Sequence, residues 1–439
     1  MFVTSDRRGQ PSVPLIRQAA QLRLQAAQLL GYKTNSEFAH EICMAGNPAN
    51  VHDFESKLLD RLAIAGDREI AELSELKRQD PDDSTGDGKV YAWDVQFYLN
   101  RLKQTRYNVD ESAIRPYLPT VHVIDQILRF YEHLLHVHVK KVQIPVWHES
   151  VDAYEVSDDE FGFLGHIYID AYPRANKENH PCTMPLRSGF LCADGESRES
   201  PAAILITNVS KGSDTQPSLM SHNDLRVVLH ELGHVFHVIC LRSSYAMFSL
   251  MSIEFDFIEA PSQMLENWVW QPEILKRFSK HHVTGQPLPD DLSQAIIAAR
   301  NVGVPIDGLR RMYQSAFDQA IHNASENVES VDVAQLYSDL RKQIGRLDTG
   351  DLVLPAVGIF HHMMSGYDSR FYVYMWGMVF SADMFAQRFA KEGIDNPDTG
   401  RDYRREILQP GPTRDAAESL RRFLGREPSD AAFFAALNV

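Results

Sequence analysis

The chain has 439 residues, of which 44% are hydrophobic, and 44 basic against 59 acidic residues give a formal net charge of −15. This length and composition allow a large folded core and argue against a low-complexity or disordered chain. Because the basic residues form no stripe that could offset the acidic excess, nucleic acid is not expected as a partner.

The cysteines are few and have no close spacing, which predicts neither a disulfide framework nor a cysteine metal site and favours a cytoplasmic protein. No apolar run approaches a transmembrane span, so no membrane partner is expected. A mitochondrial presequence is the less favoured alternative, based on Arg7, Arg8, Arg17 and Arg23 near the N-terminus.

Apolar residues at helical spacing predict helices over residues 14–30, 51–77 and 121–139. A small mixed sheet is expected next, with strands over residues 162–172 and 202–209 and turns at Pro173, Pro181 and Pro185. The polar stretches 79–88 and 196–201 are interpreted as loops, and the chain is expected to be helical almost throughout after Asp224. The predicted fold class is therefore mainly α with a small mixed β-sheet.

These elements predict one catalytic unit over residues 1–439. Residues 1–140 would form a helical wall, 141–210 a small sheet region and 211–439 a helical region with the functional residues. The strand at 202–208 has two interpretations, a plain core strand or an edge strand that binds an extended peptide by strand addition. Its position in the sheet would distinguish them.

Two histidines one helical turn apart, His230 and His234, enclose Glu231 in the motif His-Glu-Leu-Gly-His. Positions i and i+4 share one helical face, so both imidazoles can reach one cation. The flanking apolar residues recur at i, i+3, i+4 and i+7, which predicts a helix with a buried face. The motif is typical of zinc hydrolases, in which the glutamate is the general base.

A catalytic zinc site usually has a third protein ligand. His237 shares the helical face, but it lies seven residues, or about 10 Å, beyond His230, so a packing role is favoured over coordination. Glu259 is the better candidate, on a second helix. Spacing alone leaves Glu254 and Asp256 as alternatives.

The sequence resembles the thimet oligopeptidase and neurolysin family of zinc metallopeptidases, which have a zincin-like catalytic architecture with a substrate cleft. Three blocks carry the resemblance most strongly: residues 230–237, residues 245–249 (Tyr-Ala-Met-Phe-Ser) and residues 256–270 (Asp-Phe-Ile-Glu-Ala-Pro-Ser-Gln-Met-Leu-Glu-Asn-Trp-Val-Trp). Further matches lie at residues 91–94, 106–107, 362–376 and 403–426, so the resemblance covers nearly the whole chain.

The resemblance implies that His230, His234 and Glu259 bind one zinc ion and that Glu231 is the general base. It also implies a substrate loop in which His362, Tyr367 and Tyr374 assist the reaction, the tyrosines as donors to the oxyanion. The expected substrates are short unstructured peptides that are cut at internal bonds.

Two features depart from the family pattern. Ser365 and Phe371 stand where the family has a glycine and a tyrosine, and tolerated variation at Phe371 is favoured over a defective catalyst. The family usually has a further helical segment at the N-terminus that this sequence does not contain. For a natural chain of this length we expect a more open cleft, or a partner or self-association that supplies the missing wall; the alternative is a truncated gene product. The alternatives to a general oligopeptidase are a repurposed enzyme for one peptide precursor or another amide, and a noncatalytic peptide-binding relative.

Overall fold

The computed structural model describes residues 9–83, 86–326, 328–350 and 355–437, so Arg7 and Arg8 lie outside the described residues. The chain divides into two compact units. The helical unit comprises Met1–Asn108, Ala299–Trp376 and Phe434–Val439, and the sheet unit comprises Val109–Ala298 and Gly377–Phe433.

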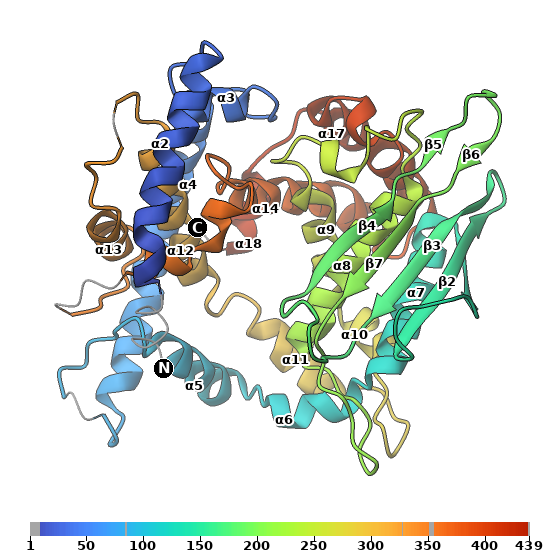
Figure 1. Cartoon of the computed structure of the whole chain (residues 1–439). Coiled ribbons are helices and arrows are strands. Elements are labelled where there is room, and N and C mark those ends of the chain that lie inside the picture. The colour runs from blue at the N-terminus through green and yellow to red at the C-terminus, as the bar shows by residue number, and fades with distance from the viewer. Residues whose placement is uncertain (1–8, 84–85, 327, 351–354, 438–439) are drawn as a thin grey trace. The chain divides into compact units, whose positions relative to one another are not determined.

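The helical unit is built from helices and short 3-10 turns, with α12 packed against α4, α2 and α13 (Figure 1). Its elements are η1 (Gln10–Ser12), α2 (Val13–Leu29), α3 (Asn35–His40), α4 (Pro48–Arg78), α5 (Val95–Tyr107), α12 (Val304–His322), α13 (Val333–Gln343), η5 (Ala356–Ile359) and η6 (His361–Met364). The start of α4 follows from its sequence, because the Asn47 side chain accepts a hydrogen bond from the Asn50 backbone N–H and Pro48 occupies the first turn.

The sheet unit holds all seven strands of the described residues. Its first elements are α6 (Glu111–Ile114), η2 (Arg115–Tyr117), α7 (Thr120–Leu135), β1 (His138–Val142), β2 (Val151–Asp158), β3 (Gly162–Asp170), β4 (Cys182–Arg187), β5 (Phe190–Leu191), β6 (Arg198–Glu199) and β7 (Ala202–Ile206).

Helices make up the remainder of the sheet unit, apart from α14 and α18, which extend across a unit boundary. These elements are α8 (His222–Cys240), η3 (Leu250–Ser252), α9 (Glu259–Leu265), η4 (Glu266–Trp270), α10 (Pro272–Phe278), α11 (Asp290–Ala298), α14 (Val373–Met384), η7 (Phe385–Phe389), α15 (Ala390–Glu392), α16 (Pro397–Tyr403), η8 (Arg404–Leu408), η9 (Gly411–Thr413), α17 (Ala416–Leu424) and α18 (Ala431–Leu437). The prediction of a mainly α fold with a small mixed sheet is confirmed.

The main sheet has the strand order β1-β2-β3-β7-β4, in which only the β3–β7 pair is parallel. Strand β7 is hydrogen-bonded to β3 on one side and to β4 on the other, and all five of its residues are buried. A peptide therefore cannot add to β7, and the strand-addition interpretation of residues 202–208 is wrong. Within the described sheet, the edge next to β7 is β4.

Helix α8 begins with a capping box, in which the Ser221 hydroxyl accepts from the Asp224 backbone N–H while the Asp224 carboxylate accepts from the Ser221 backbone N–H. The apolar face predicted for this helix is buried throughout: Leu225, Val228, Leu229, Leu232, Val235, Phe236 and Ile239. The helix packs against β7, β4 and β3, so the sheet supports the helix that carries the motif (Figure 1).

Several predicted boundaries differ from the structure. The helix predicted over residues 121–139 ends at Leu135, because His136 adopts a left-handed conformation (φ 52°) and His138 begins β1. Strands β1, β2 and β4 were not predicted, and Arg198–Glu199 forms a short strand within the predicted loop 196–201. No helix among the described residues has both the length and the apolar character needed to cross a membrane.

Candidate metal centre

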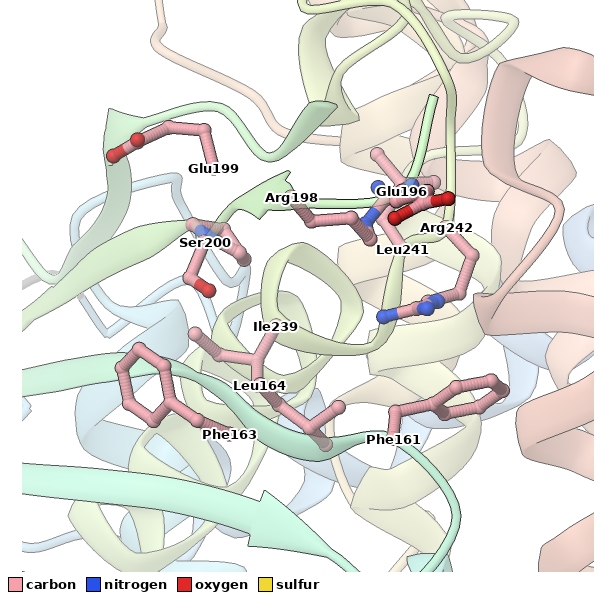
Figure 2. Close-up of a pocket in the computed structure, with 11 residues that line it drawn as sticks. Phe161, Phe163, Leu164, Glu196, Arg198, Glu199, Ser200, Ile239, Leu241 and Arg242 are labelled. Atoms are coloured by element: carbon pink, nitrogen blue, oxygen red, sulfur yellow. The ribbon is translucent and has the colours of Figure 1, made fainter. Parts of the chain in front are cut away.

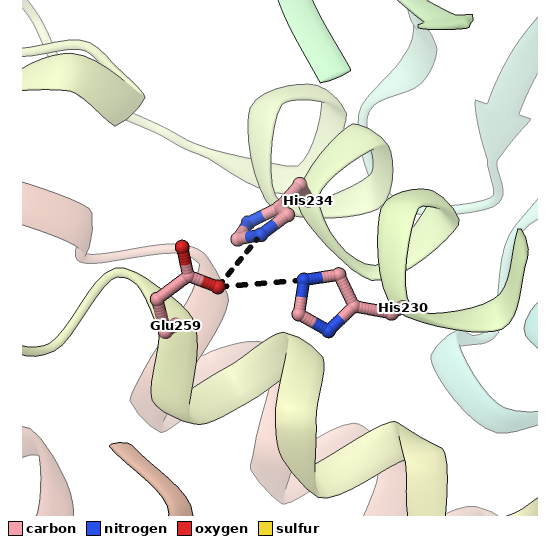
Figure 3. A group of neighbouring side chains, drawn as sticks. All are labelled: His230, His234 and Glu259. Carbon is pink, nitrogen blue, oxygen red and sulfur yellow. Dashed lines mark ion pairs between the residues drawn. The ribbon is translucent and has the colours of Figure 1, made fainter. Parts of the chain in front are cut away.

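His230, His234 and Glu259 come together where α9 crosses α8 (Figure 3). Glu259 Oε2 lies 3.4 Å from His230 Nε2 and 3.5 Å from His234 Nε2. All three side chains are largely buried, with 11 to 17% of each exposed. The one-turn spacing of the histidines places both imidazoles beside the same carboxylate oxygen.

These distances suit a zinc ion. In a tetrahedral site with ligand bonds of 2.0–2.1 Å, neighbouring ligand atoms are separated by about 3.3 Å. The observed separations of 3.4 and 3.5 Å are close to that edge length. Two imidazoles and one carboxylate are also the three-ligand set that leaves a further position for water or substrate.

Gly233 allows the two helices to approach this closely. A Cβ atom on Gly233 would lie 2.8 Å from Cδ1, the end of the flexible Leu265 side chain, and 3.2 Å from the Ser262 Cα, which is tighter than most contacts of a Cβ atom. A larger residue at this position would require the Leu265 side chain to move and the α9 backbone at Ser262 to shift by a few tenths of an ångström. The motif therefore includes, between the two histidines, a residue without a side chain where the helix that carries Glu259 comes closest.

Glu266 contacts His230 at Nδ1, the ring nitrogen that does not face Glu259. Its Oε1 lies 2.8 Å from His230 Nδ1, and its Oε2 accepts a hydrogen bond from Arg226 at 2.5 Å. Burial opposes the charged forms, yet hydrogen bonds with Glu259 and Glu266 raise the pKa of His230 to about 10, and the Arg226 charge with His230 lowers the pKa of Glu266 to about 2. A carboxylate on Nδ1 leaves Nε2 available for a metal ion, an arrangement found in many zinc sites.

Glu231 is buried and contacts a strand rather than another helix. The Thr183 hydroxyl, on β4, lies 2.9 Å from Glu231 Oε2 and 2.8 Å from the Glu231 carbonyl oxygen. Strand β4 therefore restricts the orientation of the Glu231 carboxylate. A carboxylate held beside a metal site can accept a proton from an attacking water.

The other ligand candidates lie in different surroundings. His237 is 1% exposed, and neither of its ring nitrogens has a hydrogen-bond partner in the part of the chain that the structure describes. Burial together with the charge of His234 lowers the pKa of His237 to about 3. Glu254 Oε2 accepts from the Ala416 backbone N–H at 2.7 Å, at the start of α17. Asp256 is fully buried and is not in the three-residue cluster.

The predicted loop residues lie in the helical unit, where they contact one another. Tyr374 Oη is 3.3 Å from His362 Nε2, and the Tyr367 and Tyr374 rings are stacked with centroids 5.5 Å apart. Phe371 is 4% exposed and packs edge-on against Phe360 in the core of this unit. A hydroxyl on that ring would need a buried partner, which supports tolerated variation at Phe371.

Thr183 and Glu266 were not predicted. Glu266 lies within the block 256–270 that carries the resemblance, so it could have been found as a match to the family, but no spacing rule assigns it a role. Thr183 gave no signal, because its strand was interpreted as a turn between two prolines.

Comparison of the sequence with protein-family models matches residues 3–439 to peptidase family M3. The chain is 32% identical to a thimet-like oligopeptidase of Dictyostelium discoideum, over 100% of this chain and 66% of that protein. It is 32% identical to saccharolysin of Saccharomyces cerevisiae, over 100% of this chain and 63% of that protein. It is 30% identical to oligopeptidase A of Escherichia coli, over 93% of this chain and 59% of that protein. The chain thus spans about 60% of the length of these relatives.

Solved structures support the fold. An M32 carboxypeptidase from Deinococcus radiodurans R1 matches with a TM-score of 0.57 at 13% identity, over 97% of this chain and 73% of that chain. PZ peptidase A, solved with an inhibitor, matches with a TM-score of 0.51 at 14% identity, over 96% and 63%. At such low identity the likeness concerns the arrangement of helices and strands.

Proposed function

The chain belongs to peptidase family M3, and on this basis we propose that it is a zinc metallopeptidase that hydrolyses internal bonds of short peptides. The observation that carries the proposal is the cluster of His230, His234 and Glu259, with ligand atoms at the separations of a tetrahedral zinc site. The names of the relatives, thimet-like oligopeptidase and oligopeptidase A, support oligopeptides as substrates.

We assign the three metal-ligand positions to His230 Nε2, His234 Nε2 and a Glu259 carboxylate oxygen. A zinc ion bound there would polarise the scissile carbonyl and lower the pKa of a coordinated water. Glu266, which contacts His230 Nδ1 at 2.8 Å, would hold that imidazole in the tautomer that coordinates through Nε2.

Glu231 is the proposed general base. Its carboxylate would take the proton from the attacking water and pass it to the leaving amine, so that one group acts first as base and then as acid. Thr183 supports this role because its hydroxyl restricts the carboxylate to one orientation.

Strand β4 is the proposed docking edge for the peptide backbone. It is the edge strand of the sheet next to α8, and its residues are half-buried or exposed rather than fully buried. An extended peptide can add to such an edge through backbone hydrogen bonds that do not depend on its sequence. The peptide would then lie beside the strand that contacts Glu231.

Stabilisation of the oxyanion is assigned to Tyr374, Tyr367 and His362 from the resemblance, and their mutual contacts in the helical unit support a shared role.

All four cysteines are free in the structure, which supports a reducing compartment such as the cytosol.

The test is incubation of zinc-loaded protein with a mixture of short peptides, with products identified by mass spectrometry and Glu231→Gln as the control. Internal cuts that disappear in Glu231→Gln would support the proposal. Cuts in a single peptide of a broad mixture would favour the dedicated enzyme instead, and tight binding without turnover would favour a noncatalytic relative.

A further inference from the structure

A cavity of about 360 Å³ lies in the sheet unit beside the C-terminal end of α8 (Figure 2). Apolar side chains from β3 and α8 form part of its wall, among them Phe163, Leu164 and Ile239. Arg198 and Ser200 lie across the cavity from Phe163 and Leu164 (Figure 2). The cavity therefore combines an apolar surface with a polar one, as small-ligand sites usually do.

Two guanidinium groups, those of Arg198 and Arg242, line this cavity. Arg198 donates one hydrogen bond, to the Ser243 carbonyl oxygen at 2.6 Å, and Arg242 lies over the Phe161 ring with 3.9 Å between Cζ and the ring centroid. Within the described ranges neither arginine forms an ion pair. Burial lowers the pKa of both groups, and the Arg198 charge lowers the pKa of Arg242 further, but arginine at neutral pH stays protonated.

The acidic groups nearby form no ion pair with these arginines among the described residues, although the charges of Asp158 and of the exposed Glu160 raise the pKa of Arg242 and so offset part of the effect of burial. Glu199 pairs with Arg187 at 2.5 Å, and Asp158 pairs with Arg404. Glu196 is exposed at the cavity and forms no ion pair among the described residues. Two half-buried cations that form no ion pair among the described residues are costly, because their mutual repulsion adds to their partial desolvation.

The cavity is separate from the metal centre although both involve α8. Ile239 lies nine residues beyond His230, and at 100° per residue this places it on the opposite side of the helix. It also lies five residues, or about 7.5 Å, beyond His234 along the axis. A ligand in the cavity would therefore not contact the metal ligands.

We infer that this cavity binds a small monocarboxylate that carries an apolar group. The carboxylate would lie between Arg198 and Arg242, where it satisfies both charges, and the apolar group would pack on Leu164 and Ile239. A bare inorganic anion would leave the apolar wall in contact with water. Both the C-terminal residue of a peptide and a free aromatic or aliphatic acid have this chemistry.

The test is calorimetric titration of the full-length protein with 3-phenylpropanoate, and separately with its neutral amide. We expect the acid to bind at least about tenfold more tightly than the amide, because hydrogen bonds to a charged group are lost in the amide. N-acetyl-L-phenylalanine serves as the mimic of a peptide C-terminus. Binding of both acids supports a general site, and binding of the acetylated amino acid alone supports the site with peptide C-termini as its ligands.

Variants separate this site from the metal centre. Arg242→Gln should weaken binding of the acid about tenfold. The Arg242 guanidinium makes no hydrogen bond among the described residues, so its loss leaves no acceptor there unpaired. Glu196→Gln should tighten binding, and Arg129→Gln, on the exposed face of α7, should leave it unchanged. Removal of zinc should also leave it unchanged.

Three results would overturn the inference: equal affinity of the acid and the amide, heats that disappear on zinc removal but persist in Arg242→Gln, or binding of inorganic phosphate without binding of either acid. The comparison of acid with amide on the wild-type protein decides the question even where a variant fails to fold. Since heat of binding is measured, the outcome does not depend on the proposed peptidase activity.

Discussion

The hydroxyl of Thr183 is 2.9 Å from Glu231 Oε2 and 2.8 Å from the carbonyl oxygen of the same residue. The edge strand β4 thus contacts helix α8 at Glu231, the residue directly after His230. Two acceptors share one hydroxyl proton, so the contact restricts the orientation of Glu231 without neutralising it.

Replacing Thr183 with the isosteric valine should lower kcat by about tenfold and leave KM unchanged. A hydrogen bond to a charged acceptor contributes about 1.5–3 kcal/mol, and the shared proton puts the effect near the lower end of this range. Steady-state kinetics on one quenched peptide would measure the change. Thr183→Ser should recover most of kcat, and zinc content and melting temperature should stay at wild-type values. Full activity in Thr183→Val would show that the strand does not position the base.

Glu266→Gln should weaken zinc binding by about 10- to 100-fold, because a carboxylate on the distal nitrogen orients a coordinating imidazole and increases its basicity. Competition with a chelator of known affinity would measure the change in dissociation constant. Glu273→Gln, on an exposed position of α10, is the matched control. An unchanged dissociation constant in Glu266→Gln would mean that His230 is held by packing alone.

Glu55, on α4, should make folding less favourable as the pH rises. Burial, reinforced by the Asp318 charge, raises the pKa of Glu55 to about 8 from its ordinary 4.5. Below about 4.5 both states are protonated. Between that pH and about 8 the unfolded chain loses the proton that the folded protein keeps, so the free energy of unfolding falls over this window.

Urea unfolding at a series of pH values would measure this effect as the difference between the wild type and Glu55→Gln. The difference should grow in favour of the variant from about pH 4.5 to about pH 8 and then level off. Parallel curves for the two proteins would rule out a raised pKa.

Asp318→Asn should destabilise the helical unit at the segment that precedes Tyr374. The fully buried Asp318 carboxylate accepts from the Ser369 N–H at 2.8 Å and from the Phe371 N–H at 3.0 Å. An asparagine amide can accept only one of these, and an unsatisfied buried donor costs about 1–3 kcal/mol. Urea unfolding should show a loss of this size, and Asp339→Asn, on an exposed position of α13, should show none.

Helix α8 was predictable because its cap, its apolar period and its motif all agree on one local structure. Strand β4 was not, since Pro181 and Pro185 indicate turns. Pro185 is tolerated there only because β4 is an edge strand and the register shifts after that residue, which depends on neighbours in three dimensions. The contact of Glu266 with His230 likewise depends on how η4 approaches α8. A sequence pattern thus identifies the candidate metal ligands, such as His230 and His234, more readily than the residues that contact and orient them, such as Glu266.

The absence of a side chain at Gly233 bears on which metal ion the proposed site could bind. The span between Glu259 and the two imidazoles is determined by how closely α9 approaches α8. Tyr403 also contacts α9, because its hydroxyl donates to the Pro261 carbonyl oxygen at 3.3 Å. If these three residues bind a metal ion as proposed, selectivity among cations of different radius would depend on helix packing, and residues that do not contact the ion could alter it.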